Sequence, residues 1–175
     1  MSEPRIAAIV YDRTDPVDTV LAGFAERLAA HGRRVAGLVD ADPAPDACIT
    51  REMALRDLST GAVTSICQDL GANARGCRID PRGLAEAGAL LRAGLAARPD
   101  CVIVNKFGKM EADGLGLADE IGHCVAEGVP LVIGVPRRFL DAWNAFAGGL
   151  DTPLACDAAA LDAWWTDTAA EPAGR

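Results

Sequence analysis

Short apolar runs that alternate with segments of helical periodicity limit the fold of this sequence more than any other feature. The first run, residues 5–11, is too short for a helix. Over residues 17–28 the apolar side chains recur every three or four positions, and a second apolar run follows at 34–39. This order predicts two parallel strands joined by a helix. Asp15 is predicted to be the N-cap of that helix, with Pro16 at its first position.

The same alternation returns in the second half of the chain. Helical spacing over 84–95 precedes an apolar run at 101–104, and a predicted helix at about 117–127 precedes another run at 130–135. Two more helices are predicted, at 137–147 and 157–166. We therefore expect a three-layer α/β fold, with a mostly parallel sheet flanked by helices. It forms a single domain over residues 1–167, followed by a flexible tail at 168–175.

The middle of the chain departs from this alternation. Two polar-apolar segments, 49–58 and 62–70, are joined by a turn sequence and predict a β-hairpin insertion near 48–80. A further short strand is predicted at 77–80. Arginines concentrate in this part of the chain, and they either close over an anion site or line an exposed face of the hairpin: Arg51, Arg56, Arg75 and Arg78.

Charge and hydropathy exclude several classes of function. The net charge of −8 and the isoelectric point near 4.7 oppose general binding to nucleic acid. No stretch approaches the roughly 18 apolar residues of a membrane span, and the start of the chain does not have the pattern of a secretory signal. We expect a cytoplasmic protein without membrane insertion.

The sequence gives less information on the roles of the cysteines and tryptophans. Six cysteines are widely spaced without a Cys-x-x-Cys pair, so structural zinc is not expected, and free thiols such as Cys101 are the simplest interpretation. Trp143 and the pair Trp164 and Trp165 either pack internally or contact another copy of the chain in a homo-oligomer.

The two lysines of the chain, Lys106 and Lys109, lie in one loop at 105–116, directly after an apolar strand. Ligands of open α/β sheets bind beyond the carboxyl ends of the strands. Lys106, Lys109 and the first amides of the next helix would together hold a tetrahedral anion. The other candidate ligand-binding positions of this loop are Asn105, Gly108, Glu111, Gly114 and Gly116. The alternative is a solvated loop whose glycines only turn the chain.

The loop after the first strand, residues 12–19, occupies the place of a phosphate loop but lacks its chemistry. It contains no glycine and no lysine, and Asp12, Asp15 and Asp18 would repel a triphosphate unless a metal intervened. Arg13 and Thr14 remain as donors for a smaller anion. A plain helix cap is the simpler role for Asp15.

Part of this sequence resembles a known family. The segment Asn105-Lys106-Phe107-Gly108-Lys109-Met110-Glu111, with the strand and helix layout of 5–31, resembles small P-loop nucleoside triphosphatases, in which this strand end reads Asp-Glu-Ile-Gly-Lys-Met-Glu. A closer resemblance, over residues 5–150, is to a bacterial family of unknown function encoded near molybdate-uptake genes. It is carried by Leu55-Arg56-Asp57-Leu58, Gln68-Asp69-Leu70-Gly71, Gly76-Cys77-Arg78-Ile79-Asp80, Asn105-Lys106-Phe107-Gly108-Lys109 and Ala145-Phe146-Ala147-Gly148-Gly149.

The departures from the triphosphatase pattern lead to two hypotheses. The phosphate loop is degenerate, and Asn105 and Lys106 replace the acidic pair that would bind magnesium. The first hypothesis is a binding protein for a tetrahedral oxyanion, molybdate or tungstate, held by Lys106, Lys109, Arg13 and Thr14. The second is a nucleotide-binding protein or nucleoside triphosphatase that uses ATP or GTP with magnesium, with metal on an aspartate of the first loop and Glu111 as base.

Overall fold

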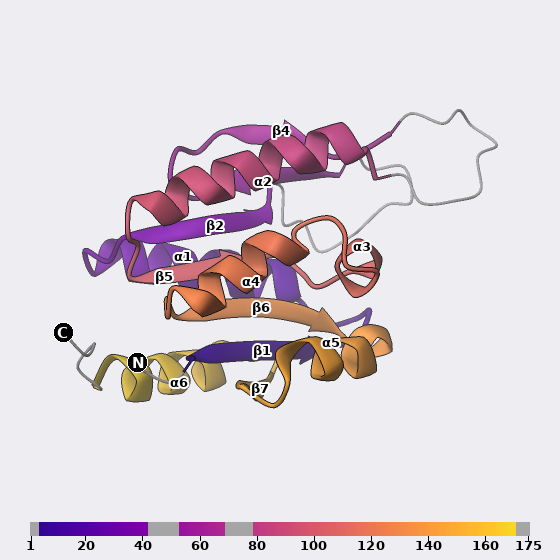
Figure 1. The fold of residues 1–175 in the computed structure, drawn as a ribbon. Helices are drawn as coiled ribbons and strands as arrows, with labels where there is room; N and C mark the ends of the chain where they lie inside the picture. The colour runs from indigo at the N-terminus through magenta and orange to yellow at the C-terminus, as the bar shows by residue number, and fades with distance from the viewer. Residues whose placement is uncertain (1–3, 42–52, 69–78, 171–175) are drawn as a thin grey trace.

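The computed structural model describes residues 4–41, 53–68 and 79–170, which form one sheet with helices on both faces (Figure 1). The strands are β1 (Ile6–Tyr11), β2 (Val35–Asp40), β3 (Ala54–Asp57), β4 (Val63–Ser65), β5 (Cys101–Val104), β6 (Leu131–Pro136) and β7 (Asp151–Ala155). The helices are α1 (Val17–Ala30), α2 (Pro81–Ala96), α3 (Lys109–Ala112), α4 (Ala118–Ala126), α5 (Leu140–Ala147) and α6 (Ala158–Ala170), with a 3-10 turn η1 (Arg137–Phe139) before α5.

The sheet has the order β4-β3-β2-β5-β6-β1-β7. Strands β2, β5, β6, β1 and β7 are parallel to one another, whereas β3 is antiparallel to both β2 and β4. The predicted mostly parallel sheet is therefore confirmed. Strands β1 and β2 run in the same direction, as predicted, but β5 and β6 lie between them. The carboxyl ends of β1, β2, β5 and β6 meet at one edge of the sheet.

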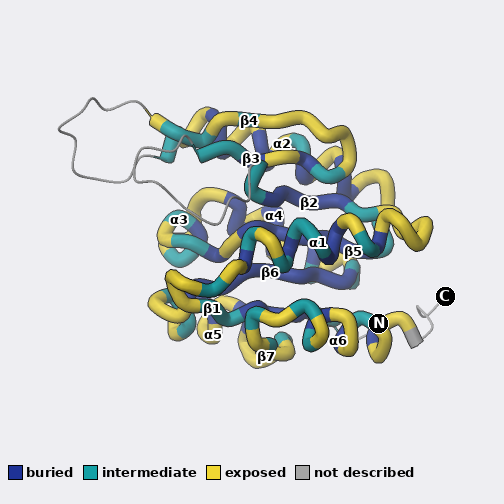
Figure 2. The backbone as a smooth tube through the Cα atoms, turned by 180° about the vertical axis from the view of Figure 1, so that it is seen from behind, coloured by how far each residue is buried: buried dark blue, intermediate teal, exposed yellow. Residues whose placement is uncertain are grey.

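Each buried strand supplies side chains alternately to the two faces. Ile6 and Ala8 of β1 pack on the face covered by α2, α4 and α5, while Ala7 and Ile9 pack on the face covered by α1 and α6. The exposed outer surfaces of these helices and the buried sheet between them are seen in Figure 2. Because both faces are covered, the central strands are apolar along their whole length, as the short apolar runs indicated.

The predicted hairpin lies at one end of the sheet. Strands β3 and β4 form an antiparallel pair, and β3 also pairs with β2, so the hairpin extends the sheet itself. The predicted strand at 77–80 is represented by a single bridge between Cys67 and Ile79. The rest of this region, including Cys48, Arg51, Cys77 and other parts of 42–52 and 69–78, lies outside the described residues.

Three local predictions differ from the structure. Helix α1 begins after Pro16 without a side-chain cap, because the Asp15 carboxylate accepts a hydrogen bond from the Asp12 amide at 2.7 Å instead. Strand β7 was not predicted, since the segment 151–155 has no apolar run. Helix α6 continues to Ala170, so residues 168–170 are helical, and the remainder of the predicted tail lies outside the described residues.

The tryptophans contribute to packing within the chain. Trp143 is fully buried beside Phe107, with ring centroids 5.2 Å apart, and its indole N–H donates to Asp151 of β7 at 2.9 Å. Trp164 is buried, and Trp165 contacts Phe24 edge to face. These contacts tie α5 to the sheet and α6 to α1.

The cysteines of the described residues are free thiols: Cys67, Cys101, Cys124 and Cys156. Cys101 and Cys124 are buried in the core, and burial raises the pKa of Cys124 to about 12. Both buried thiols therefore remain protonated at neutral pH and act as small apolar side chains. Among the residues that the structure describes, no helix has the length and apolar character needed to cross a membrane.

Replacing Gly37 by alanine tests the close approach of β2 and β5. A Cβ at Gly37 would lie 1.9 Å from the carbonyl oxygen of Ile103, at a backbone φ of +132°. We expect the Gly37→Ala free energy of unfolding, measured by urea denaturation, to fall by roughly 3 kcal/mol or more because the two strands must separate.

Gly32→Ala is the matched control for this substitution. Gly32 also has a positive φ, +73°, but nothing lies within 4 Å of an added Cβ. Its replacement should cost only the backbone strain of about 1–2 kcal/mol. Equal losses in the two variants would show that the approach of β5 does not constrain position 37.

Candidate functional site

Two hollows lie at the carboxyl ends of the central strands and share Lys106. The first, which we call the basic pocket, has a volume of about 370 Å³ and is lined by Tyr11, Asp12, Arg13, Lys106, Pro136, Arg137 and Arg138. The second, the apolar pocket, has a volume of about 100 Å³. It is lined by Leu38, Asp40, Met53, Ala54, Leu55, Ile66, Ile79, Leu84, Asn105, Lys106, Gly108, Glu111 and Leu117.

The basic pocket gathers four cationic side chains around one carboxylate. Arg13 follows β1, Lys106 follows β5, and Arg137 and Arg138 follow β6. The Nε of Arg137 donates to both carboxylate oxygens of Asp12, at 3.2 and 3.0 Å. The excess of positive charge contrasts with the net charge of −8 for the whole chain. This pocket is suited to an anion.

Tyr11 forms part of the wall of the basic pocket. Burial raises the pKa of its hydroxyl above the ordinary value; the Asp18 carboxylate acts in the same direction, and Arg138 opposes it. The phenol is therefore neutral at physiological pH. It can donate a hydrogen bond to a bound anion without adding negative charge.

Two amides of the loop after β1, those of Asp12 and Asp15, are already bonded within the loop. The Asp15 carboxylate accepts from the Asp12 amide at 2.7 Å, and the Asp15 amide donates to the Asp12 carbonyl at 3.0 Å. A side chain of the loop thus takes a backbone donor that a phosphate loop would offer to its ligand. Of the two predicted donors of this loop, Arg13 lines the basic pocket, and Thr14 is exposed and lines neither pocket.

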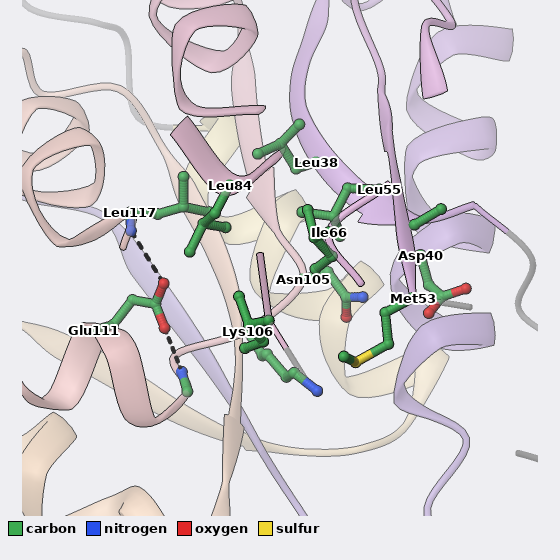
Figure 3. A pocket seen from close by; sticks show the side chains of 13 residues that line it. Leu38, Asp40, Met53, Leu55, Ile66, Leu84, Asn105, Lys106, Glu111 and Leu117 are labelled. Atoms are coloured by element: carbon green, nitrogen blue, oxygen red, sulfur yellow. Dashed lines mark hydrogen bonds between the residues drawn. The ribbon is translucent and has the colours of Figure 1, made fainter. Parts of the chain in front are cut away.

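Glu111 organises the loop between β5 and α4. The side chain is buried, with 6% exposed. One carboxylate oxygen accepts from the Gly108 amide at 2.9 Å, and the other accepts from the Leu117 amide at 3.0 Å (Figure 3). Two amides that could receive an anion ligand, those of Gly108 and of Leu117 at the start of the predicted helix, are therefore already bonded to a carboxylate of the chain itself. Both oxygens of Glu111 have amide donors, an arrangement typical of a structural brace.

Glycine is required at position 116 by the same brace. A Cβ on Gly116 would lie 2.4 Å from a carboxylate oxygen of Glu111, and the backbone φ is +61°. Gly114, with a φ of +75°, turns the chain after α3. Neither glycine lines either pocket. The sequence singled out these glycines as ligand contacts, and the structure places them at turns that support the loop.

Asn105 connects three elements at the end of β5. With its amide oriented to satisfy its hydrogen bonds, the nitrogen donates to Asp18 of α1 at 3.0 Å and the oxygen accepts from the Asp40 amide at 3.1 Å. The side chain is buried, with 8% exposed. Asn105 therefore fixes the backbone from which the neighbouring Lys106 extends into the site.

The structure separates the two lysines that the sequence placed together. Lys106 lines both pockets, whereas Lys109 lines neither of them. Lys109 lies on α3 and forms an exposed ion pair with Asp113 at 2.6 Å. Helix α3 begins at Lys109, and this side chain pairs with Asp113 one turn further along the helix. The ammonium groups of Lys106 and Lys109 are therefore not directed to one ligand.

Sequence reasoning missed Arg137 and Arg138 as site residues. They directly follow the apolar run of β6, and the same rule that selected Lys106 after β5 applies to them. Because both arginines fall in the helix predicted at 137–147, the sequence did not indicate that they follow a strand end. Of the arginines in the middle segment, Arg56 donates to the Ala41 carbonyl at 2.9 Å and lines neither pocket. Arg51, Arg75 and Arg78 lie outside the described residues.

The donor set of the basic pocket does not suit magnesium. Asp12 is paired with Arg137, and Asp15 is bonded to the Asp12 amide. At the end of β5, Asn105 and Lys106 stand where a metal site would need carboxylates. Over residues 4–41, 53–68 and 79–170, no three histidine, cysteine or acidic side chains come together in a metal-binding group.

Comparison with known proteins identifies the family and the fold. A family model described as "Protein of unknown function (DUF2478)" matches residues 6–164. The chain belongs to this family, as the closer resemblance implied. A crystal structure of THEP1 from the hyperthermophile Aquifex aeolicus superposes with a TM-score of 0.67 over 93% of this chain and 96% of that one, at 13% sequence identity. The expected P-loop-like three-layer fold is confirmed.

A longer relative shares part of its sequence with this chain. The Molybdenum import ATP-binding protein ModC 2 of Bradyrhizobium diazoefficiens is 40% identical over 164 residues. That match covers 94% of this chain but 18% of the relative. The chain thus corresponds to a small part of a much longer protein.

Removing the charge of Glu111 tests its role as a brace. In Glu111→Gln the side-chain nitrogen accepts no hydrogen bond, so either the Gly108 or the Leu117 amide loses its partner. We expect the free energy of unfolding to fall by about 1–3 kcal/mol in urea denaturation. The exposed Glu127→Gln on the end of α4 is the control, and equal effects in both variants would contradict the brace.

Proposed function

We propose that this protein binds the phosphate groups of a nucleotide in the basic pocket and does not hydrolyse them. The observation that carries the proposal is the convergence of four cationic side chains from the ends of three strands. Lysine and arginine form charge-assisted hydrogen bonds with phosphate oxygens. The confirmed P-loop-like fold and the ATP-binding name of the longer relative support a nucleotide as the ligand class.

We expect no hydrolysis because of the residues in two loops, 12–19 and 105–116. Phosphoryl transfer in this type of fold needs an amide cradle, a lysine on the terminal phosphates and a positioned magnesium ion. Residues 12–19 contain no glycine or lysine. Glu111, the candidate base, directs both oxygens at backbone amides. We therefore expect no phosphate release from ATP or GTP with magnesium, checked by a phosphate assay. Turnover that is lost in Glu111→Gln would contradict this account.

A second candidate ligand is a tetrahedral oxyanion such as molybdate or tungstate. The internal carboxylates of Asp15 and Glu111 occupy loop amides, which leaves side chains as the principal donors. A compact dianion needs fewer donors than a triphosphate. The longer relative is named for molybdenum import. On this reading, Arg13, Lys106, Arg137 and Arg138 surround the oxyanion without a nucleotide.

Calorimetric titration of matched variants tests the site. We expect Lys106→Ala and Arg137→Ala each to weaken ATP or GTP binding about 10- to 100-fold, because each removes a charge-assisted hydrogen bond to phosphate. Lys109→Ala is the control, since Lys109 is of the same type, three residues away, and paired with Asp113. It should bind as the parent does.

The same titration distinguishes the two candidate ligands. Binding of molybdate or tungstate but not of nucleotides, with loss in Lys106→Ala, would favour the oxyanion. Binding that is equal in the parent and in the variants of Lys106 and Arg137, for every ligand, would overturn the basic pocket as the site. Weaker binding in Lys109→Ala, with unchanged binding in the Lys106 and Arg137 variants, would instead place the site at α3.

A further inference from the structure

The apolar pocket adjoins the basic pocket and differs from it in chemistry. Its walls come from β2, β3, α2 and α3 and from residues that flank β4, β5 and α4, and aliphatic side chains dominate them: Leu38, Leu55, Ile66, Ile79, Leu84 and Leu117. Figure 3 shows the labelled leucines and Ile66 gathered at one end, while Lys106 extends its ammonium group away from them. The pocket thus joins an apolar end to a cationic one.

The polar side chains in the apolar pocket are mostly used within the protein. Both carboxylate oxygens of Glu111 accept backbone amides, and the amide of Asn105 bonds to Asp18 and to the Asp40 backbone. These groups present little unsatisfied polarity to a ligand. The pocket therefore favours a flat, mainly apolar group over a second anion.

We propose that the apolar pocket receives the base of the nucleotide whose phosphates occupy the basic pocket, and that it selects a single-ring base. This inference rests on the proposed function, since it needs phosphates at the basic pocket. Lys106 is the physical link, because it lines both hollows. The ligand class is then a pyrimidine nucleotide.

The volume of the apolar pocket sets the size of the base. A cavity of roughly 150 Å³ lined by aliphatic and aromatic side chains holds one benzene molecule. The apolar pocket measures about 100 Å³. A single six-membered ring can enter it with one edge left at the mouth, whereas the second ring of a purine would remain outside the aliphatic walls. Selection is therefore by ring size, and the polar edge of cytosine or uracil stays hydrated at the mouth, because the pocket offers it few unsatisfied partners.

The test compares diphosphates that share one anionic group. Calorimetric titration of the full chain with pyrophosphate, CDP, UDP, ADP and GDP separates the contribution of the base from that of the phosphates. We expect CDP and UDP to bind about tenfold more tightly than pyrophosphate, as the burial of one ring predicts. ADP and GDP should bind with an affinity close to that of pyrophosphate.

A substitution that fills the apolar pocket provides a second test of this proposal. The side chain of Ile66, directly after β4, lines the apolar pocket, so Ile66→Trp should fill it, remove the advantage of CDP and UDP, and leave the affinity for pyrophosphate unchanged. Ala62→Trp is the control, because Ala62 is exposed in the turn of the same hairpin and lines neither pocket. If thermal unfolding shows that Ile66→Trp is not folded, Ile66→Phe takes its place.

The outcomes separate this inference from the proposed function. Pyrophosphate binding with no advantage for CDP or UDP, or tighter binding of ADP and GDP, would overturn the single-ring pocket and leave the basic pocket intact. An advantage that persists unchanged in the folded Ile66 variants would place the base elsewhere. Failure of all five ligands to bind would overturn the proposed function itself.

Discussion

The pair of hydrogen bonds from the Gly108 and Leu117 amides to Glu111 is the interaction on which the site depends. It closes the loop between β5 and α4 around a buried carboxylate, and it fixes the segment from which Lys106 extends. The Asp15 carboxylate occupies the Asp12 amide in a similar way. In both loops a side chain of the protein takes a donor that an anion ligand would otherwise use. The site is therefore built from cationic side chains.

The regular elements with strong hydrophobic patterns could be predicted from the sequence. Buried strands such as 101–104 and helices such as 84–95 were found because their burial on one or both faces dictates the pattern. Strand β7 could not be found in this way. It is an edge strand with exposed residues and a proline at position 153, which only an edge position tolerates.

The candidate site was predicted only in part, because its contacts depend on tertiary geometry. The Asp-Pro signal caps a helix at Asp80, whose carboxylate accepts from the Arg82 amide, but the same signal at Asp15 stabilises a turn. The clustering of lysines singled out Lys106, which lines both strand-end pockets. It also selected Lys109, which the helical turn of α3 directs to Asp113.

A crystal structure of the protein with pyrophosphate tests the central claim most directly. The account predicts an anion between Arg13, Lys106, Arg137 and Arg138, with the Asp15 carboxylate still bonded to the Asp12 amide. The contrary result is an anion held by the backbone amides of the loop after β1, with Asp15 displaced. That result would mean that the loop is a working phosphate cradle and that the cationic side chains are secondary to it.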